Sequence, residues 1–470
     1  MVGLASLKGR AELRRVTAAA SAVVTLTLAA GSIAHAQPAA PPQADNPPAA
    51  TAPAAIPSDT PAGMRAAHIL DLINGDVTVD PAAVREWTDA AVLNSLGPDG
   101  LAAPLEQLRT TGPYEFVSYS GTSTAATVAL KTRTGLPFEL RIYVSTAGDA
   151  DTVNGLLVRP QTPDIESFDD FTAALDVLGT DYAVLAAHIE DTTCVPVFEA
   201  HAERSMPMAS VAKLYVLGAV ADAISAGDLR WDEVLTITTD TKSLPTGELQ
   251  DRADGSTVTV REATEKMISL SDNTATDLLI HRLGREAVEA QAVALGHHDP
   301  ESLTPFPTTR EAFLIGFGDP ERREAWREAD YADRLALLDS VQGEPLEVDE
   351  TTIIYRPVYP DGVDWFGSQN DICAAYAHLK AKDTNVTDIL ALNPGLTLSS
   401  TDWSYTGFKG GTMPGVLATS WILTDNTGQD WYFGVQQSST GAIGLAENLY
   451  TFEIAGKIMG RSDAAVLRIN

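Results

Sequence analysis

Three short polar stretches contain the residue types that serine-based acyl transfer requires. In chain order they are Ser210-Val-Ala-Lys213, Ser271-Asp-Asn273 and Lys409-Gly-Gly-Thr412. A serine hydroxyl is a poor nucleophile at neutral pH and needs an adjacent base. A lysine can be that base when burial lowers its pKa. Each stretch alone is a weak signal, so the prediction depends on the three occurring together.

The first stretch lies in Met208–Ala226, a run that is apolar nearly all round and is therefore predicted to be a buried helix ending at Gly227. Residues three apart on a helix lie one turn apart on the same face, so Ser210 and Lys213 can reach each other. The structural alternative is that Ser210 only caps the helix while Lys213 reaches solvent.

The second stretch lies between two predicted helices, where short polar side chains often serve only as caps. In the functional interpretation, Ser271 passes a proton toward a leaving group. Asn273 then forms hydrogen bonds with the substrate amide and with Lys213.

The third stretch precedes a strand-like run, and glycines at a strand edge allow a ligand to lie against the backbone. Lys409 would attract a substrate carboxylate, and Gly411 would permit close approach. The backbone N–H of Thr412, together with that of Ser210, would form an oxyanion hole. The alternative is a plain glycine turn.

The three stretches resemble the active-site signature of class A serine β-lactamases and penicillin-binding proteins. The resemblance implies that Ser210 is the acylated nucleophile and Lys213 the general base. It implies that Ser271 and Asn273 form the second motif, and Lys409, Gly411 and Thr412 the third. It also implies an antiparallel sheet built from both ends of the domain and packed against a helical subdomain.

The sequence departs from this family in the stretch His297–Glu311, which lacks the Glu-x-x-Leu-Asn motif whose glutamate activates the deacylating water. Glu301 is a weak candidate for that role, and Glu311 is interpreted as structural because it opens the next predicted helix. A β-lactam acyl-enzyme is therefore expected to turn over slowly. In the third motif Gly410 replaces a hydroxyl residue, which is expected to weaken carboxylate binding unless Thr412 substitutes for it.

The segment Phe313–Trp365 has no obvious counterpart in compact β-lactamases. It contains a predicted charged helix over Pro320–Ser340. The segment could be a lid over the site or a plain surface insertion.

The predicted fold class is α+β, in two domains. Residues 1–36 form a predicted signal peptide, with a basic start, an apolar run and the cleavage signal Ala34-His-Ala36. Residues 37–62 form a Pro/Ala-rich linker. A small domain over 63–163 precedes the β-lactamase-like domain over 164–462 and a tail over 463–470. The protein is expected to be secreted or extracytoplasmic, without a stable membrane anchor after cleavage.

The small domain is predicted to begin with helices near Met64–Leu72 and Pro81–Leu93, followed by an antiparallel sheet. This order resembles the cone-shaped fold shared by a nuclear transport factor and the steroid isomerases. Asp76, Asp80 and Asp89 are interpreted as cap or surface residues rather than as a general base. The two-domain layout is similar to a group that includes the cephalosporin-esterase-like protein of clavulanic acid gene clusters, which suggests ester hydrolysis.

The composition restricts the partners. The formal net charge of -31 argues against nucleic acid and anionic membranes as partners. The resemblance implies a small-molecule substrate, an ester or a β-lactam. Cys194 and Cys373 are far apart in the sequence and form no clustered metal or redox motif, and no cofactor is indicated. They could pair or could be buried thiols, and their separate contexts slightly favour the unpaired state.

The predicted function is a secreted serine hydrolase that forms an acyl-enzyme on Ser210 and cleaves an ester or a β-lactam. One alternative is a true class A β-lactamase with a different deacylation base. Another is a non-catalytic protein that senses β-lactams or cell-wall fragments.

Overall fold

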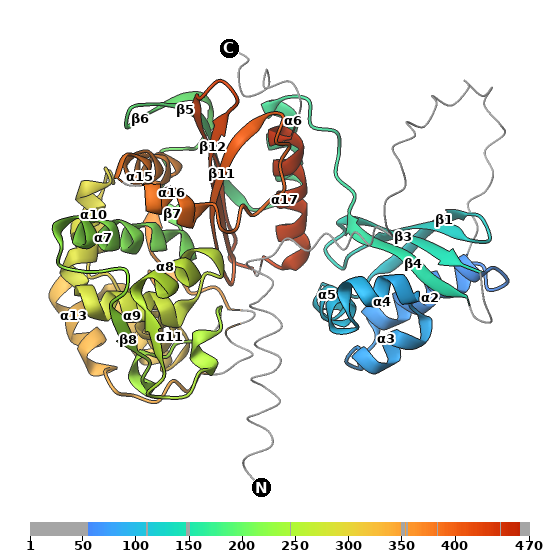
Figure 1. Cartoon of the computed structure of the whole chain (residues 1–470), viewed down its shortest axis with the longest axis horizontal. Coiled ribbons are helices and arrows are strands. Elements are labelled where there is room, and N and C mark those ends of the chain that lie inside the picture. Colours follow the sequence, from blue (N-terminus) through green and yellow to red (C-terminus); the bar gives the residue numbers. More distant parts are fainter. Residues whose placement is uncertain are drawn as a thin grey trace, which may run out of the picture. The chain divides into compact units, whose positions relative to one another are not determined.

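The computed structural model describes residues 55–460 except 110, 147–150, 245, 349–352, 354–355, 383 and 442. The predicted signal peptide, most of the predicted linker and the tail lie outside the described residues. The chain divides into two compact units between Pro163 and Asp164, and the C-terminal segment Leu445–Glu453 is grouped with the first unit. Each unit is described by itself (Figure 1).

The N-terminal unit has helices followed by a sheet, as predicted. Its helices are α2 (Pro61–Asn74), α3 (Pro81–Trp87), α4 (Ala90–Leu96) and α5 (Asp99–Arg109). Its antiparallel sheet has the order β1-β2-β3-β4, formed by β1 (Glu115–Gly121), β2 (Ala125–Lys131), β3 (Pro137–Ser145) and β4 (Thr152–Pro160). Helix α5 and strand β4 were not predicted. The likeness to the steroid isomerases stays a prediction.

The predicted single helical segment near Pro81–Leu93 is wrong, because two helices meet there. Thr88 has an extended backbone, and the Asp89 carboxylate accepts the N–H of Ala91 to start α4. Asp80 caps α3 in the same way, through the N–H of Ala82. The interpretation of Asp80 and Asp89 as cap residues is therefore confirmed.

The C-terminal unit contains a five-stranded antiparallel sheet made from both ends of the domain, as predicted. Its order is β11-β12-β13-β5-β6, formed by β5 (Asp181–Glu190), β6 (Thr193–Ala200), β11 (Trp403–Met413), β12 (Val416–Asp425) and β13 (Asp430–Ser438). The third polar stretch lies inside the edge strand β11 and does not precede a strand. The α+β fold class is confirmed.

One face of this sheet packs against the helices of the middle of the chain (Figure 1). They include α7 (Lys213–Ala226), α8 (Val260–Ser269), α9 (Asn273–Leu283), α10 (Arg285–Ala294), α15 (Gln369–Lys382) and α16 (Thr384–Leu390). On the opposite face, α6 (Phe168–Asp176) packs the ring of Phe171 edge-on against Phe433 of β13. Helix α17 (Leu445–Met459) ends the described chain.

The central helix α7 is buried because it is apolar on nearly every side. The run Ala209–Ala226 is the one helical segment in the described chain that is long and apolar enough to cross a membrane, yet 67% of it is buried inside the domain. This burial is typical of the core helix of a globular domain. Gly227 ends α7 in the left-handed conformation, at φ 81°, as predicted.

The segment 313–365 builds a hydrophobic cluster of its own. The segment includes most of α11 (Thr309–Phe317), then α12 (Pro320–Glu328) and α13 (Tyr331–Ser340), and all three helices contribute residues to the cluster. The predicted single helix over Pro320–Ser340 is wrong, because the Asp330 carboxylate caps a new helix. Leu244 and Met413 pack against this cluster, and they lie near the second and third stretches. The segment is therefore packed against the neighbours of the predicted site.

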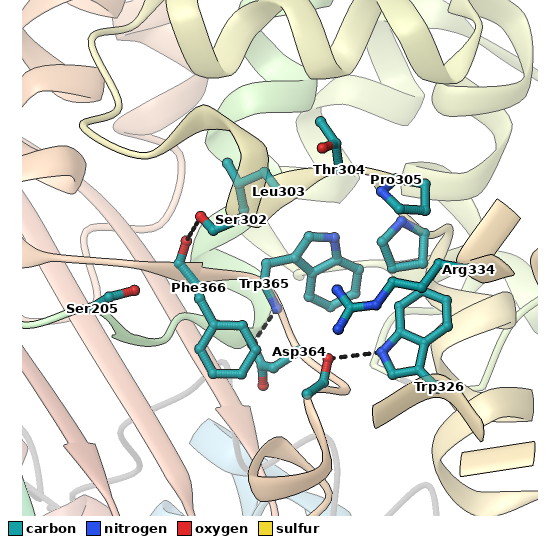
Figure 2. A pocket seen from close by; sticks show the side chains of 12 residues that line it. Ser205, Ser302, Leu303, Thr304, Pro305, Trp326, Arg334, Asp364, Trp365 and Phe366 are labelled. Carbon is teal, nitrogen blue, oxygen red and sulfur yellow. Dashed lines mark hydrogen bonds between the residues drawn. The ribbon is translucent and has the colours of Figure 1, made fainter. Parts of the chain in front are cut away.

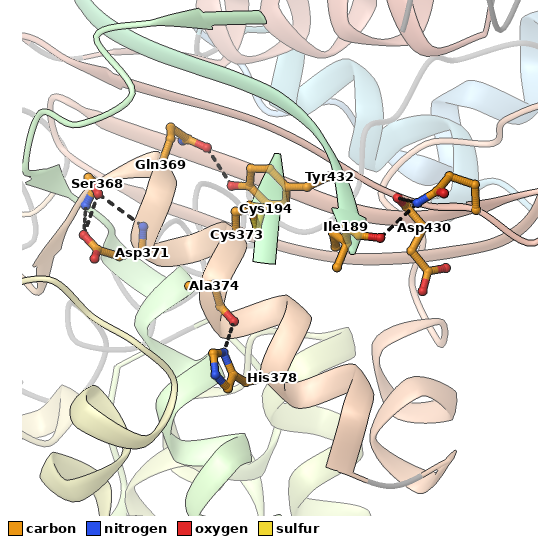
Figure 3. Close-up of a disulfide and its surroundings, with 11 residues drawn as sticks. Ile189, Cys194, Ser368, Gln369, Asp371, Cys373, Ala374, His378, Asp430 and Tyr432 are labelled. Carbon is orange, nitrogen blue, oxygen red and sulfur yellow. Dashed lines mark hydrogen bonds between the residues drawn. A yellow bond between two sulfur atoms is a disulfide. The ribbon is translucent and has the colours of Figure 1, made fainter. Parts of the chain in front are cut away.

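Cys194 and Cys373 form a disulfide with a Cα–Cα distance of 6.4 Å, so the slight preference for unpaired thiols was wrong. Figure 3 shows the pair joining β6 to α15. The error has a physical reason: α15 packs on β5 and β6, so residues that are 179 positions apart become neighbours. Pairing depends on this spatial geometry, which sequence separation does not reveal.

Candidate active site

Ser210 lies on a tight helical turn at the entrance of α7. Residues Ala209–Ala212 form a 3-10 helix, and the α-helix begins at Lys213. Side chains three positions apart eclipse each other on a 3-10 helix, so Ser210 and Lys213 still share one face. Ala209 adopts a φ of 45°, which is uncommon without glycine, and its N–H donates to Asp364 Oδ1 at 2.7 Å. This buried carboxylate therefore helps to hold the turn that presents Ser210.

Lys213 is buried, with 3% of its surface exposed, so it does not reach solvent. Its ammonium Nζ donates to Ser271 O at 2.5 Å, to Ser271 Oγ at 3.2 Å and to Asn273 Oδ1 at 2.7 Å. Burial lowers the pKa of Lys213 to about 7, against an opposing effect of the Asp272 and Asp277 carboxylates. A lysine with this pKa can act as a base at neutral pH.

Ser271 lies between α8 and α9 and adopts a left-handed φ of 56°. Its Oγ accepts hydrogen bonds from Lys213 Nζ and, at 3.0 Å, from Lys409 Nζ. The hydroxyl thus connects two buried cationic side chains. Strained backbone of this kind persists where the surrounding structure holds it, as Thr246 does by donating to Ser271 O at 2.6 Å.

The second stretch combines the functional and the structural interpretation. Asp272 is a cap, because its Oδ1 accepts the N–H of Ala275 at 2.8 Å. Asn273 makes the predicted contact with Lys213, while its Nδ2 donates to Leu244 O at 2.9 Å. The amide donor that was predicted to hold a substrate is therefore engaged by the backbone in this structure.

Lys409 projects inward from the edge strand β11 and is 1% exposed. Besides Ser271 Oγ, its Nζ contacts Gly410 O at 2.6 Å. Burial and the nearby Lys213 charge both lower the pKa of Lys409 well below its ordinary value. The side chain therefore supplies a hydrogen-bond donor to Ser271, while its lowered pKa weakens the positive charge that was predicted to attract a carboxylate.

Gly411 allows β11 to lie against the backbone that carries Ser210. A Cβ at this position would be 2.4 Å from Met208 O and 2.6 Å from Ser210 N, so a side chain cannot fit. Gly411 therefore brings the next residue, the partly exposed Thr412, beside the Ser210 turn. The oxyanion hole formed by the N–H groups of Ser210 and Thr412 remains a prediction.

The described carboxylates around the site are occupied by structural contacts. Glu311 forms a capping box with Thr308 and accepts from Arg285 at 2.8 Å, which confirms its structural interpretation. Glu301 is exposed on a 3-10 helix over Pro300–Leu303. Asp272 binds backbone N–H groups. In the part of the chain that the structure describes, no carboxylate contacts Ser210, Lys213 or Ser271.

Asp277 is a buried residue that sequence reasoning missed. Its two oxygens accept the N–H groups of Thr309 at 2.7 Å and Arg310 at 2.9 Å. This contact joins the start of α11 to α9, the helix that carries Asn273. Burial raises the pKa of Asp277 to about 7. An aspartate within a helix gives no sequence signal for such a contact, because its partners are backbone groups 32 and 33 positions away.

His297, His298 and Asp371 are close enough to share a metal ion, although the sequence indicated no metal site. Both nitrogens of His297 are engaged, by the carbonyl of Phe366 and by the N–H of Asp299. Asp371 accepts from Ser368 at the start of α15 and from His298. The atoms that could bind a metal ion are already hydrogen-bonded to protein groups, so the cluster is explained as a structural network.

Residues 171–340 match the beta-lactamase enzyme family, and residues 56–149 match a family described as the N-terminal part of the ORF 12 gene product. No curated protein matches the chain.

Solved structures similar to the chain include a β-lactamase from Sphaerobacter thermophilus, with 19% identity and a TM-score of 0.44 over 63% of this chain and 96% of that one. They also include PBP-A, with 16% identity and a TM-score of 0.39 over 63% and 98%. An ancestral class A β-lactamase of Gram-negative bacteria has 18% identity and a TM-score of 0.43 over 62% and 97%.

The family match covers the first two polar stretches, and the structure brings the third stretch against them. The sheet is built from both ends of the domain, as the resemblance implied. The C-terminal domain therefore has the serine β-lactamase-like fold that the three stretches predicted.

Proposed function

We propose that the protein is a secreted serine hydrolase that forms an acyl-enzyme on Ser210 and cleaves an ester or, slowly, a β-lactam. The observation that carries the proposal is the buried Lys213, whose Nζ is connected to Ser271 and Asn273 and whose pKa is about 7. A non-catalytic protein has no need of a buried lysine with this pKa beside two polar motifs. Secretion is inferred from the predicted signal peptide alone.

In the proposed acylation step, Ser210 Oγ attacks the substrate carbonyl carbon and its proton passes to the neutral amine of Lys213. Protonated Lys213 has three N–H donors, and the structure gives its Nζ three acceptors. The neutral amine keeps two donors and gains a lone pair, which can take the Ser210 proton. The carbonyl oxygen becomes an oxyanion at the N–H groups of Ser210 and Thr412.

In the second half of acylation, the bond to the leaving group breaks and that group needs a proton. Ser271 Oγ contacts Lys213 and Lys409, so it can pass its proton to the leaving group and be reprotonated by Lys213, which holds the proton taken from Ser210. An ester releases an alkoxide, which demands less of this step than the amine released from a β-lactam. The ester is therefore the favoured substrate class.

Deacylation requires an activated water. The engaged state of Asp272 and Glu311 favours a slow step, because a carboxylate that accepts backbone N–H groups or an arginine is a weak base. Asp277 is occupied as well, since its two oxygens accept the N–H groups of Thr309 and Arg310. The same observation supports the alternative of a sensor that traps β-lactams as long-lived adducts. The other alternative, a true β-lactamase, requires a base that is not among these three residues.

The test is intact-protein mass spectrometry over time with a chromogenic cephalosporin and with small esters, using residues 37–470 and the Ser210→Ala variant. A transient adduct on the unmodified chain, with product accumulating, supports the hydrolase. A persistent adduct without product supports the sensor. Equal product formation by Ser210→Ala contradicts both, because it places the chemistry elsewhere.

A further inference from the structure

The C-terminal domain has a cavity of about 280 Å³ that lies outside the proposed catalytic stretches (Figure 2). Its walls come from the loop around Ser302–Pro307, from α12 and α13, and from the residues that precede the short strand β10 (Phe366–Gly367). Trp326, Trp365 and Phe366 provide aromatic surface. This volume is at the small end of ligand pockets, so it suits a compact organic molecule.

Two hydrogen-bond donors and one acceptor at this cavity have no partner among the described residues. They are Arg334 Nε, Trp365 Nε1 and Asp364 Oδ2, and all three atoms are buried. The Trp365 side chain is itself only 7% exposed. Unsatisfied buried donors are uncommon in native proteins, and a bound water or ion is one of the established reasons for them.

The Arg334 guanidinium carries a positive charge at the cavity, and no acidic side chain among the described residues neutralises it. The Arg334 guanidinium stacks over the Trp326 ring, with its carbon 4.9 Å from the ring centroid. Burial lowers the pKa of Arg334, and no acidic group among the described residues opposes that effect. The one carboxyl at the cavity, Asp364, already binds the N–H groups of Ala209 and Trp365 through Oδ1, and burial raises its pKa to about 7. Asp364 is therefore a poor counter-ion for Arg334.

We propose that this cavity binds a small organic carboxylate with an aromatic or compact apolar body. The carboxylate accepts from Arg334 Nε and Trp365 Nε1, and the apolar body lies against the indole, phenyl and proline surfaces. A desolvated guanidinium beside an indole N–H selects an anion, since charge-assisted hydrogen bonds are stronger than neutral ones. The inference does not depend on acyl transfer at Ser210.

The first experiment is calorimetric titration of the full secreted chain with phenylacetate and, as a neutral control of the same shape, phenylacetamide. Phenylacetate is expected to bind saturably, with a Kd on the order of 1 mM or tighter. Phenylacetamide is expected to bind at least about tenfold more weakly than phenylacetate, because it lacks the charge. Equal binding of the two, or no saturable binding of phenylacetate up to about 10 mM, would overturn the proposal.

The second experiment locates the site with variants. Arg334→Gln and Trp365→Phe should each weaken phenylacetate binding, by about tenfold for Arg334→Gln. Arg327→Gln is the matched control, because Arg327 pairs with Glu324, Glu328 and Asp361 and does not line the cavity. If Arg334→Gln fails to fold, the test depends on two other measurements. They are phenylacetate binding by Trp365→Phe, which retains an aromatic ring, and the comparison of phenylacetate with phenylacetamide.

The catalytic stretch also contains a cation, Lys409, that could attract a carboxylate. A Lys409→Gln variant therefore separates the two places. Retained binding in Lys409→Gln with loss in Arg334→Gln supports the cavity. Loss in Lys409→Gln with full binding in Arg334→Gln places the carboxylate at the catalytic stretch and overturns the proposal.

Discussion

The surroundings of Ser210 and the segment His297–Glu311 differ in how their polar groups are used. Around Ser210, Lys213 and Lys409 converge on one hydroxyl of Ser271, an arrangement suited to proton transfer. In the second region, Glu311 binds Arg285 and caps a helix, and the loop is anchored by Asp277. The comparison teaches that the groups proposed to form an acyl-enzyme can stay together while the carboxylates nearby serve the fold.

The largest effect is expected from Ser210→Ala, which removes the proposed nucleophile of the first region. Adduct formation with any acylating substrate should fall by about 10^3-fold or more, as measured by mass spectrometry and initial rates. Ser225→Ala, at an exposed position on the same helix, is the control. Normal turnover by Ser210→Ala would remove the basis of the comparison.

Replacing Lys213 with methionine should slow acylation by about 10^2- to 10^4-fold, because the buried base is lost. In the unmodified protein, the acylation rate should rise with pH through about 7, since the pKa of Lys213 is about 7 and only the neutral amine accepts a proton. Stopped-flow acylation between about pH 6 and about pH 8 measures this. A flat profile would assign the base to another group. Lys131→Met, in the N-terminal unit, should leave the rate unchanged.

Asp277→Ala tests whether the second region is held for structural reasons. The N–H groups of Thr309 and Arg310 would be left buried without an acceptor, which costs about 1–3 kcal/mol of unfolding free energy. Denaturant unfolding measures the loss. Asp319→Ala, which removes an exposed cap from α12, should cost less. If Asp277→Ala instead slows deacylation while the free energy of unfolding hardly changes, Asp277 is part of the chemistry.

The smallest effect is expected from Glu301→Gln. Glu301 is exposed, and turnover should stay within about twofold of the unmodified protein. Steady-state rates with esters and with a cephalosporin provide the measurement. If the acyl-enzyme instead accumulates and its release slows by an order of magnitude, Glu301 is the deacylation base and the two regions are no longer different in kind.

The sequence predicted those parts of the site that depend on local pattern. Ser210 and Lys213 share a face because they are three positions apart, and Gly411 is needed where two backbones meet. The sheet was predictable because β5, β12 and β13 are continuous apolar runs. Strand β11 was not identified, because its centre contains Lys409 and two glycines that are typical of turns.

Contacts between distant segments could not be predicted. Asp277 acts on backbone groups of a later helix, and Asp364 acts on the N–H of Ala209, 155 positions earlier. Residue type indicates only that a carboxylate can accept hydrogen bonds. The disulfide was missed because it depends on a partner far away in the sequence. The new helices that begin after Asp89 and Asp330 were missed because the local pattern does not show whether an aspartate caps a helix.

The Cys194–Cys373 disulfide has a consequence for proteolysis. It closes a covalent ring that contains Ser210, Ser271 and the whole segment 313–365, while Lys409 lies outside the ring. A single cut anywhere in that segment would leave two polypeptides still joined through sulfur. Such a nicked protein would migrate as one species until a reductant is added, and its first two catalytic stretches would stay tethered to the third.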